Sequence, residues 1–143
     1  MKVSPLVTLD TNVIISSFLT PGKSREIIDL AARRKILVFS SPQLEEELIK
    51  TLRGKLKYSD EELSQALISF KEIVYKYVYP KNKLKVIAQD ETDNRIIEAG
   101  VEGKAEYIVT GDKHLLKIGK YKGIKILSPS EFLNLYVNYS LPE

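Results

Sequence analysis

The stretch VSPLVTLDTN, residues 3–12, decides the fold, because a short apolar run in it ends at an acid. Val3 to Leu9 contains β-branched and aliphatic residues, a composition that predicts a buried strand. Asp10 follows at the end of this run, and Thr11-Asn12 offers a cap for a short helix. The stretch therefore predicts a strand that leads directly into a helix.

Strand and helix patterns alternate along the rest of the chain. We predict further strands at residues 36–39, 86–88, 107–109 and 124–127. Helices are expected at residues 24–34, 42–54, 60–77, from Asp90 or Thr92 to 102, 113–118 and 129–137. This alternation implies a parallel sheet covered by helices on both faces. The predicted fold class is α/β, a three-layer α/β/α arrangement with a central mainly parallel sheet, in one domain over residues 1–143.

The composition is that of an ordinary globular domain. The chain has 143 residues, of which 43% are hydrophobic and 29% are charged. No apolar run is long enough to cross a membrane, and the N-terminus lacks the apolar stretch of a signal peptide. The chain has no cysteine, so disulfides are impossible and a cytoplasmic location is expected. The net charge of +3 permits nucleic-acid binding without requiring it.

Four carboxylates stand where the packing of a core does not explain them: Asp10, Glu47, Asp93 and Asp112. Asp10 follows the first strand directly, and Asp112 follows the strand at 107–109 by three residues. In parallel sheets, sites form outside the carboxyl ends of the strands, where these two acids would lie. The chain has no cysteine and one histidine, so the acids offer oxygen ligands, which suit hard cations such as Mg²⁺ or Mn²⁺. We therefore predict metal-dependent phosphoryl chemistry.

Each of these acids also has a purely structural interpretation. Acids such as Asp93 are favoured in the first turn of a helix by capping and by the helix dipole. Asp112 resembles a turn or cap residue, and an Asp that follows a strand at a helix start, as Asp10 does, is a routine cap. Glu47 belongs to a run of three glutamates, and a solvated helix face explains the other two. Only its place beside Leu48 separates it from them.

Two stretches of the chain are basic and contain no acid. The first holds Lys50, Arg53, Lys55 and Lys57, and the second holds Lys81, Lys83 and Lys85. Solvated surface is the simplest explanation of such stretches, and contact with nucleic-acid phosphates is the sharper hypothesis, which we apply to the first. His114 lacks a partnered acid or nucleophile in the sequence and is expected to be an exposed residue.

The predicted helix at residues 60–77 carries a broad apolar stripe. Its members recur at helical spacing and are Leu63, Leu67, Phe70, Val74 and Tyr77. Either this stripe packs on the sheet, or part of it stays exposed and joins two copies of the chain. We predict a two-fold homodimer, because such closed pairs are the commonest assembly.

Four motifs, read in order, resemble those of the PIN-domain family. More narrowly, the chain is similar to the PIN-type toxins of prokaryotic toxin–antitoxin pairs. The motifs are Leu9-Asp10-Thr11-Asn12-Val13, residues 41–48, residues 90–94 and Val109-Thr110-Gly111-Asp112. The resemblance covers nearly the whole chain, as far as residues 126–133.

The resemblance implies a PIN-like fold and an endoribonuclease that uses Mg²⁺ or Mn²⁺ to hydrolyse RNA. It equates the four acids of the family with Asp10, Glu47, Asp93 and Asp112, and two supporting polar positions with Asn12 and Thr110. It also implies a homodimer and, for a toxin, a small antitoxin protein as partner.

Three other functions compete with this one. A non-catalytic PIN-like module would bind RNA or a protein without cutting. An aspartyl-phosphate enzyme would carry a second Asp two residues after Asp10, where this chain has Asn12. A receiver-like signalling domain would carry paired acids before the Asp that ends the first strand, and this chain has none there.

Overall fold

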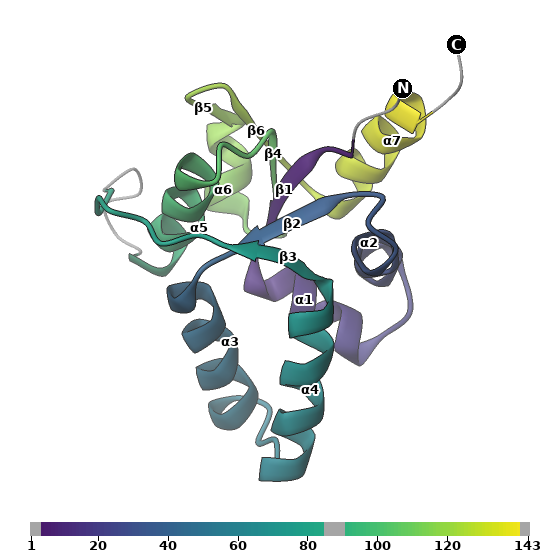
Figure 1. The fold of residues 1–143 in the computed structure, drawn as a ribbon, viewed down its shortest axis with the longest axis vertical. Coiled ribbons are helices and arrows are strands. Elements are labelled where there is room, and N and C mark those ends of the chain that lie inside the picture. The colour runs from purple at the N-terminus through teal and green to yellow at the C-terminus, as the bar shows by residue number, and fades with distance from the viewer. Residues whose placement is uncertain (1–3, 85–90, 141–143) are drawn as a thin grey trace.

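The computed structural model describes residues 4–84 and 91–140, without the side chains of residues 91–93, 139 and 140. Strands and helices alternate along most of the chain (Figure 1). In chain order they are β1 (Leu6–Leu9), α1 (Thr11–Leu19), α2 (Lys23–Ala32), β2 (Leu37–Ser40), α3 (Pro42–Gly54), α4 (Asp60–Ile73), β3 (Val74–Tyr77), α5 (Glu91–Glu102), β4 (Tyr107–Val109), α6 (Lys113–Ile118), β5 (Lys120–Tyr121), β6 (Ile124–Leu127) and α7 (Pro129–Ser140). None of the helices in the described ranges has both the length and the apolar character that crossing a bilayer requires.

The strands form one six-stranded sheet in the order β3-β2-β1-β4-β6-β5. All neighbouring strands are parallel except β5 and β6, which form an antiparallel hairpin. The predicted α/β fold with a mainly parallel sheet is therefore confirmed. Because β1, β2 and β4 are parallel neighbours, the residues that follow them lie at the same edge of the sheet, which we name the carboxyl edge. The opposite side, formed by the residues that precede β2, β4 and β6, is the amino edge.

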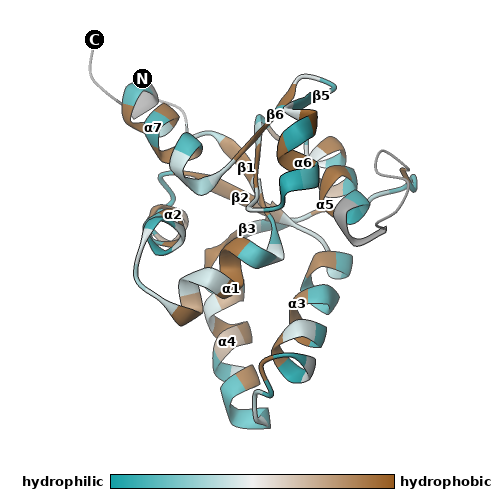
Figure 2. Ribbon diagram, turned by 180° about the vertical axis from the view of Figure 1, so that it is seen from behind, coloured by the Kyte–Doolittle hydropathy of each residue, from teal (hydrophilic) through white to brown (hydrophobic). Residues whose placement is uncertain are grey.

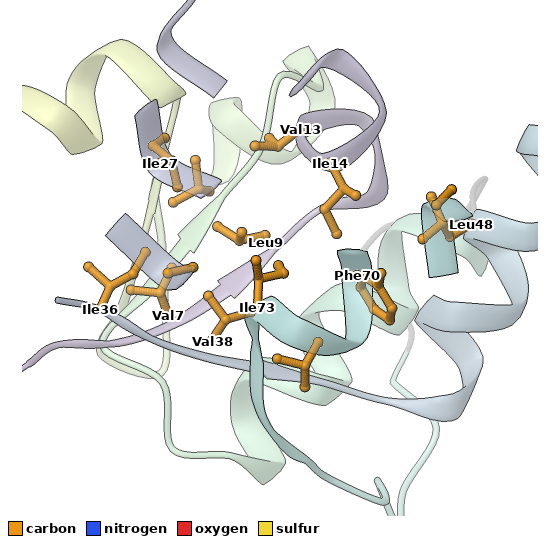
Figure 3. Close-up of a cluster of buried hydrophobic side chains, with 14 of the residues drawn as sticks. Val7, Leu9, Val13, Ile14, Ile27, Ile36, Val38, Leu48, Phe70 and Ile73 are labelled. Carbon is orange, nitrogen blue, oxygen red and sulfur yellow. The ribbon is translucent and has the colours of Figure 1, made fainter. Parts of the chain in front are cut away.

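Helices cover the sheet on both faces. On one face, Val7 and Leu9 of β1 pack with residues of α1, α2 and α4 (Figure 3). On the other face, Ile108 of β4 and Ile126 of β6 pack with residues of α5 and α6. Successive side chains of a strand point to opposite faces, so Val109 joins the first cluster although its neighbour Ile108 belongs to the second. The apolar residues, brown in Figure 2, accordingly gather around the central strands.

Helix α3 leaves the carboxyl edge after β2, and α4 runs back antiparallel to it into the start of β3, at the bottom of Figure 1. The Ser41 side chain accepts a hydrogen bond from the Leu44 N–H, and Pro42 occupies the first turn, so α3 begins where the sequence predicts. Ser59 and Glu62 form a capping box at the start of α4. These caps fix where both helices begin, and α3 carries one of the candidate acids.

The predicted helix at residues 60–77 is wrong in its last turn, because α4 ends at Ile73 and Val74–Tyr77 forms β3. Local apolar spacing did not reveal this change, since β3 forms only by pairing with β2, which lies more than 30 residues earlier in the chain. Leu63, Phe70 and Val74 are buried in the core. The apolar stripe therefore packs within the molecule and does not by itself provide an interface for a second copy.

Two further differences concern short strands. The hairpin strand β5 was not expected, and it forms because Lys122 and Gly123 both adopt positive φ angles, of 48° and 83°, in the turn to β6. The strand predicted at residues 86–88 lies outside the described residues.

Candidate active site

Asp10 lies at the carboxyl edge, between the end of β1 and the start of α1. Its backbone N–H donates to the Val109 carbonyl oxygen at 2.9 Å, which keeps the residue aligned with β4. The residue is only 6% exposed, and its side chain makes no capping hydrogen bond although it stands at the N-cap position of α1. Its position is that of a helix cap, but capping alone does not explain why the carboxylate is buried.

Two polar residues hold the Asp10 carboxylate. The Thr110 hydroxyl donates to Oδ2 at 2.7 Å, and the Asn12 side-chain amide donates to the same oxygen at 3.3 Å. Thr110 Oγ1 also accepts from the Asp112 N–H at 3.0 Å, and Asn12 Oδ1 accepts from the Gly111 N–H at 3.2 Å. Thr110 and Asn12 thus tie the buried carboxylate to the loop that follows β4.

Burial controls the ionisation of this carboxylate. It raises the pKa of Asp10 above its ordinary value of 3.8, because water no longer solvates the charged form. The Thr110 hydroxyl lowers the pKa by donating to the charged form, and the backbone N–H groups of Thr11 and Asn12 act in the same direction. The negative charge of Asp112 raises the pKa further. Two neighbouring carboxylates repel each other, and a bound cation relieves that repulsion.

Asp112 follows β4 and begins α6. Its Oδ1 accepts from the N–H groups of His114 at 2.7 Å and Leu115 at 3.3 Å, so the structural interpretation of Asp112 as a helix cap is confirmed, and its role as a metal ligand stays a prediction. The same side chain is 28% exposed, and its Oδ2 accepts no hydrogen bond within the described part of the chain. Capping therefore orients the carboxylate and leaves its second oxygen open to a ligand.

Glu47 reaches the carboxyl edge from α3. Its Oε1 accepts a hydrogen bond from the Thr11 hydroxyl at 3.0 Å, which joins α3 to the first turn of α1. Thr11 is 5% exposed and directly follows Asp10. Sequence reasoning treated Thr11 only as a helix cap and missed this link. The signal available in the sequence was the hydroxyl of Thr11, which directly follows the candidate ligand Asp10 at the predicted end of the first strand.

A second contact, between Glu45 and Tyr77, also positions α3. The Tyr77 hydroxyl donates to a carboxylate oxygen of Glu45, which joins α3 to β3. Burial, and then the hydrogen bond to the negatively charged Glu45, raise the pKa of Tyr77. Glu45 was expected on a solvated helix face, and this expectation is wrong. Its partner could not be recognised from the sequence, because the strand that carries Tyr77 was predicted as helix.

The carboxyl edge lies inside the region that matches a known family. A family model described as the PIN domain matches residues 6–114, from the start of β1 into α6. The chain belongs to the PIN domain family. PIN domains are typically nucleases, and they typically use divalent metal ions. A search of curated proteins found no match.

The matched part of this PIN domain includes the four candidate acids, Asp10, Glu47, Asp93 and Asp112. The fold brings Asp10 and Asp112 together and joins Glu47 to the residue after Asp10. Asp93 lies in the first turn of α5, and its side chain is outside the described residues. Among the side chains that are described, no set of three acidic or imidazole groups is arranged to hold a metal ion. The all-oxygen donors nevertheless have the chemistry that Mg²⁺ or Mn²⁺ prefers.

The first basic stretch of this PIN domain lies at the end of α3 and in the loop before α4. Its side chains are all exposed: Lys50, Arg53, Lys55 and Lys57. Arg53 forms an exposed ion pair with Asp60 at 2.8 Å, so its charge is partly satisfied within the protein. In the second stretch Lys81 and Lys83 are exposed, and Lys85 lies outside the described residues. The His114 side chain is 72% exposed, as expected.

Proposed function

We propose that this PIN domain is a metal-dependent endoribonuclease. The observation that carries the proposal is the buried Asp10 carboxylate at the carboxyl edge, beside the charge of Asp112 and hydrogen-bonded by Thr110. Burying an acid next to a second acid costs free energy in the metal-free protein, and a divalent cation would offset that cost. The family membership supports the same chemistry.

Asp10 and Asp112 would hold the cation, and Glu47 and Asp93 would complete the site or orient water. When bound, such an ion lowers the pKa of a water molecule and stabilises charge on the phosphodiester. Thr110 and Asn12 act through Asp10, because they fix the direction of its Oδ2 and strengthen its charged form. The Thr11 hydroxyl acts in the same way on Glu47.

The finer proposal is that the nuclease is the toxin of a toxin–antitoxin pair. It rests on the resemblance of the motifs, with a small antitoxin as the partner and RNA as the substrate. A small DNA-binding protein encoded immediately upstream would support this role. We expect bacteria to stop growing when they express the wild type and to grow normally when they express Asp10→Asn.

The homodimer is likewise a proposal that rests on the resemblance. Of the apolar residues on α4, Ile68 is 53% exposed and could contribute to such an interface. Light scattering over a concentration series tests it. A mass near that of one 16.2 kDa chain at every concentration would exclude the dimer.

Adjacent glutamates of α3 provide a matched test of the nuclease. Glu47 accepts the Thr11 hydroxyl, whereas its neighbour Glu46 is exposed. We expect cleavage of a mixed RNA panel by the wild type with Mn²⁺ and none in EDTA. Glu47→Gln should slow cleavage by about 10- to 100-fold, and Glu46→Gln should not. Cleavage that persists in EDTA, or equal rates for the two variants, would contradict the site.

The competing function is a PIN-like module that binds RNA or a protein without cutting. Such a module would bind the RNA panel equally well in EDTA and Mn²⁺ and would leave every RNA intact in both. The same assay therefore separates the two functions.

A further inference from the structure

A basic hollow lies at the amino edge of the sheet, on the far side from the carboxylates. It has a volume of about 420 Å³ and is formed by the loop between α5 and β4 and the turn between β5 and β6. Its charged lining residues are Lys104, Lys122, Lys125 and Glu106. The β5–β6 hairpin that forms one wall lies at the top of Figure 1, away from α3 and α4.

The three lysines of the hollow have no acidic partner in the described part of the chain. All three are exposed, and the Lys122 ammonium lies 5.6 Å from the centre of the Tyr121 ring. The single carboxylate, Glu106, accepts from the Leu6 N–H through Oε2 at 3.0 Å and forms no ion pair with the lysines in the described part of the chain, so the side chains lining the hollow carry a net charge of +2. The hollow therefore gathers positive charge that its one carboxylate only partly offsets.

The backbone at two of these lysines is unusual. Lys104 and Lys122 have φ angles of 53° and 48°, in the left-handed region that glycine and asparagine adopt most easily. Lys104 occupies the residue after the cap in a Schellman motif, since the Lys104 N–H bonds the Val101 carbonyl and the Ala105 N–H bonds that of Gly100. Backbone requirements alone would favour glycine or asparagine at both positions.

The helix dipole explains only part of this arrangement. A cation is favoured at the carboxyl end of α5, which accounts for the charge of Lys104. Lys122 lies in a hairpin turn and Lys125 in β6, where no helix ends. Three cations around one concave surface match the repeated phosphates of a nucleic-acid backbone, which bind lysine without regard to base sequence.

We propose that the hollow formed by Lys104, Lys122 and Lys125 binds the phosphate backbone of RNA at the amino edge. This inference rests on the proposed nuclease function, from which RNA is taken as the ligand. The two edges of the sheet are separated by about 13 Å along a four-residue strand. An RNA that extends farther than this distance can therefore contact the hollow and the carboxylates together, whereas a dinucleotide cannot.

The left-handed backbone provides a variant that should fold well. Lys104→Asn together with Lys122→Asn removes two charges and places asparagine where the backbone prefers it, creating an Asn-Gly turn with Gly123. The melting temperature should equal or exceed that of the wild type. Lys104→Arg with Lys122→Arg keeps the charges, and Lys23→Gln with Lys71→Gln removes two exposed charges elsewhere.

Binding of a fluorescent 24-nucleotide RNA in EDTA tests the proposal without cleavage. The asparagine variant should bind on the order of tenfold more weakly near 0.1 M salt, with a salt slope smaller by about 0.7 for each phosphate that is no longer neutralised. The arginine variant and the Lys23/Lys71 control should bind like the wild type. Unchanged binding by the asparagine variant, or an equally weakened control, would overturn the proposal.

Two further measurements distinguish this inference from binding of a small phosphate ligand and from the proposed nuclease activity. An RNA dinucleotide should bind the asparagine variant and the wild type with nearly equal affinity, because its single phosphate can meet only one lysine of the hollow. Tripolyphosphate that saturates the wild-type hollow without displacing the long RNA would overturn the proposal in favour of a small phosphate ligand. Because binding is read in EDTA, a weakening confined to the long RNA stands even if the protein proves unable to cleave.

Discussion

The carboxyl edge of the sheet carries negative charge that is partly buried, whereas the amino edge carries positive charge that is exposed to water. At the carboxyl edge, Asp10 is 6% exposed and is held by the Thr110 hydroxyl at 2.7 Å. At the amino edge, the side chains of Lys104 and Lys122 are exposed, and the backbone of both residues has the positive φ angles that a lysine rarely adopts. The buried acids need a counter-charge within the site, whereas the exposed lysines are stabilised by water. The first edge is therefore suited to chemistry and the second to reversible contact.

The largest expected effect is at Asp10. Asp10→Asn keeps an oxygen that can accept from Thr110 and Asn12 but removes the charge that would hold the cation. RNA cleavage with Mn²⁺ should fall by at least about 100-fold, while circular dichroism stays unchanged. Asp29→Asn, which removes an exposed acid paired with Arg33 at 3.2 Å, is the control and should cleave normally. Cleavage by Asp10→Asn at the wild-type rate would show that the carboxyl edge is not the site.

The next effect tests whether the hydroxyl that orients Asp10 matters. Thr110→Val removes the hydrogen bond to Asp10 and leaves a side chain of similar shape, and the affinity for Mn²⁺ should fall by about 10- to 100-fold. The pKa of Asp10 should rise, because that hydrogen bond lowers it, so activity should disappear at a higher pH on acidification. Thr110→Ser keeps the hydroxyl and should restore both properties. Identical Mn²⁺ titrations for Val and Ser would refute the role.

A smaller effect is expected from the basic residues near the end of α3. Changing Lys50, Lys55 and Lys57 to Gln should weaken RNA binding and reduce its salt slope by about 0.7 for each phosphate that these lysines neutralise in the wild type. Arg53 is left unchanged because it pairs with Asp60. Cleavage at saturating RNA should be nearly unchanged. Equal salt slopes for variant and wild type would show that these lysines are solvated surface.

The smallest effect concerns the stability of the metal-free protein. The pKa of Asp10 is raised in the folded protein, so the unfolded chain loses its proton first as the pH rises above about 3.8. The stability that Asp10 contributes is present below that pH and is lost as the pH rises through the folded-state pKa. In EDTA at pH 7, Asp10→Asn should therefore melt at a higher temperature than the wild type, and below pH 3.8 the difference should shrink. A lower melting temperature for the variant at pH 7 would contradict this.

Local patterns were sufficient where a residue's role depends on its immediate neighbours. Ser41 and Pro42 predicted the start of α3, and the apolar run before Asp10 predicted β1. The pattern failed at Val74–Tyr77, because valine and tyrosine suit a strand as well as the apolar face of a helix. The pairing with β2 decided between them, and that pairing joins segments distant in the chain.

Gly103 shows the same limit at a single residue. The sequence predicts a helix stop near residue 103, and α5 indeed ends at Glu102. The left-handed position is nevertheless Lys104, one residue later. A Cβ at Gly103 would lie 2.3 Å from Phe39 Cδ2, so glycine is required there by the packing of α5 on β2. Only the tertiary structure separates these two reasons for a glycine.

The sequence by itself determined the alternation of strands and helices, the oxygen-only character of the acids, and the placement of Asp10 and Asp112 after strands. The tertiary structure decided which groups meet. Thr110 lies 100 residues from Asp10, and Thr11 lies 36 residues from Glu47, yet each pair is hydrogen-bonded. Such bonds form only after packing brings distant segments together and excludes the water that would otherwise solvate each group. Local residue patterns contain no information about that pairing, and the burial that perturbs Asp10 arises from it.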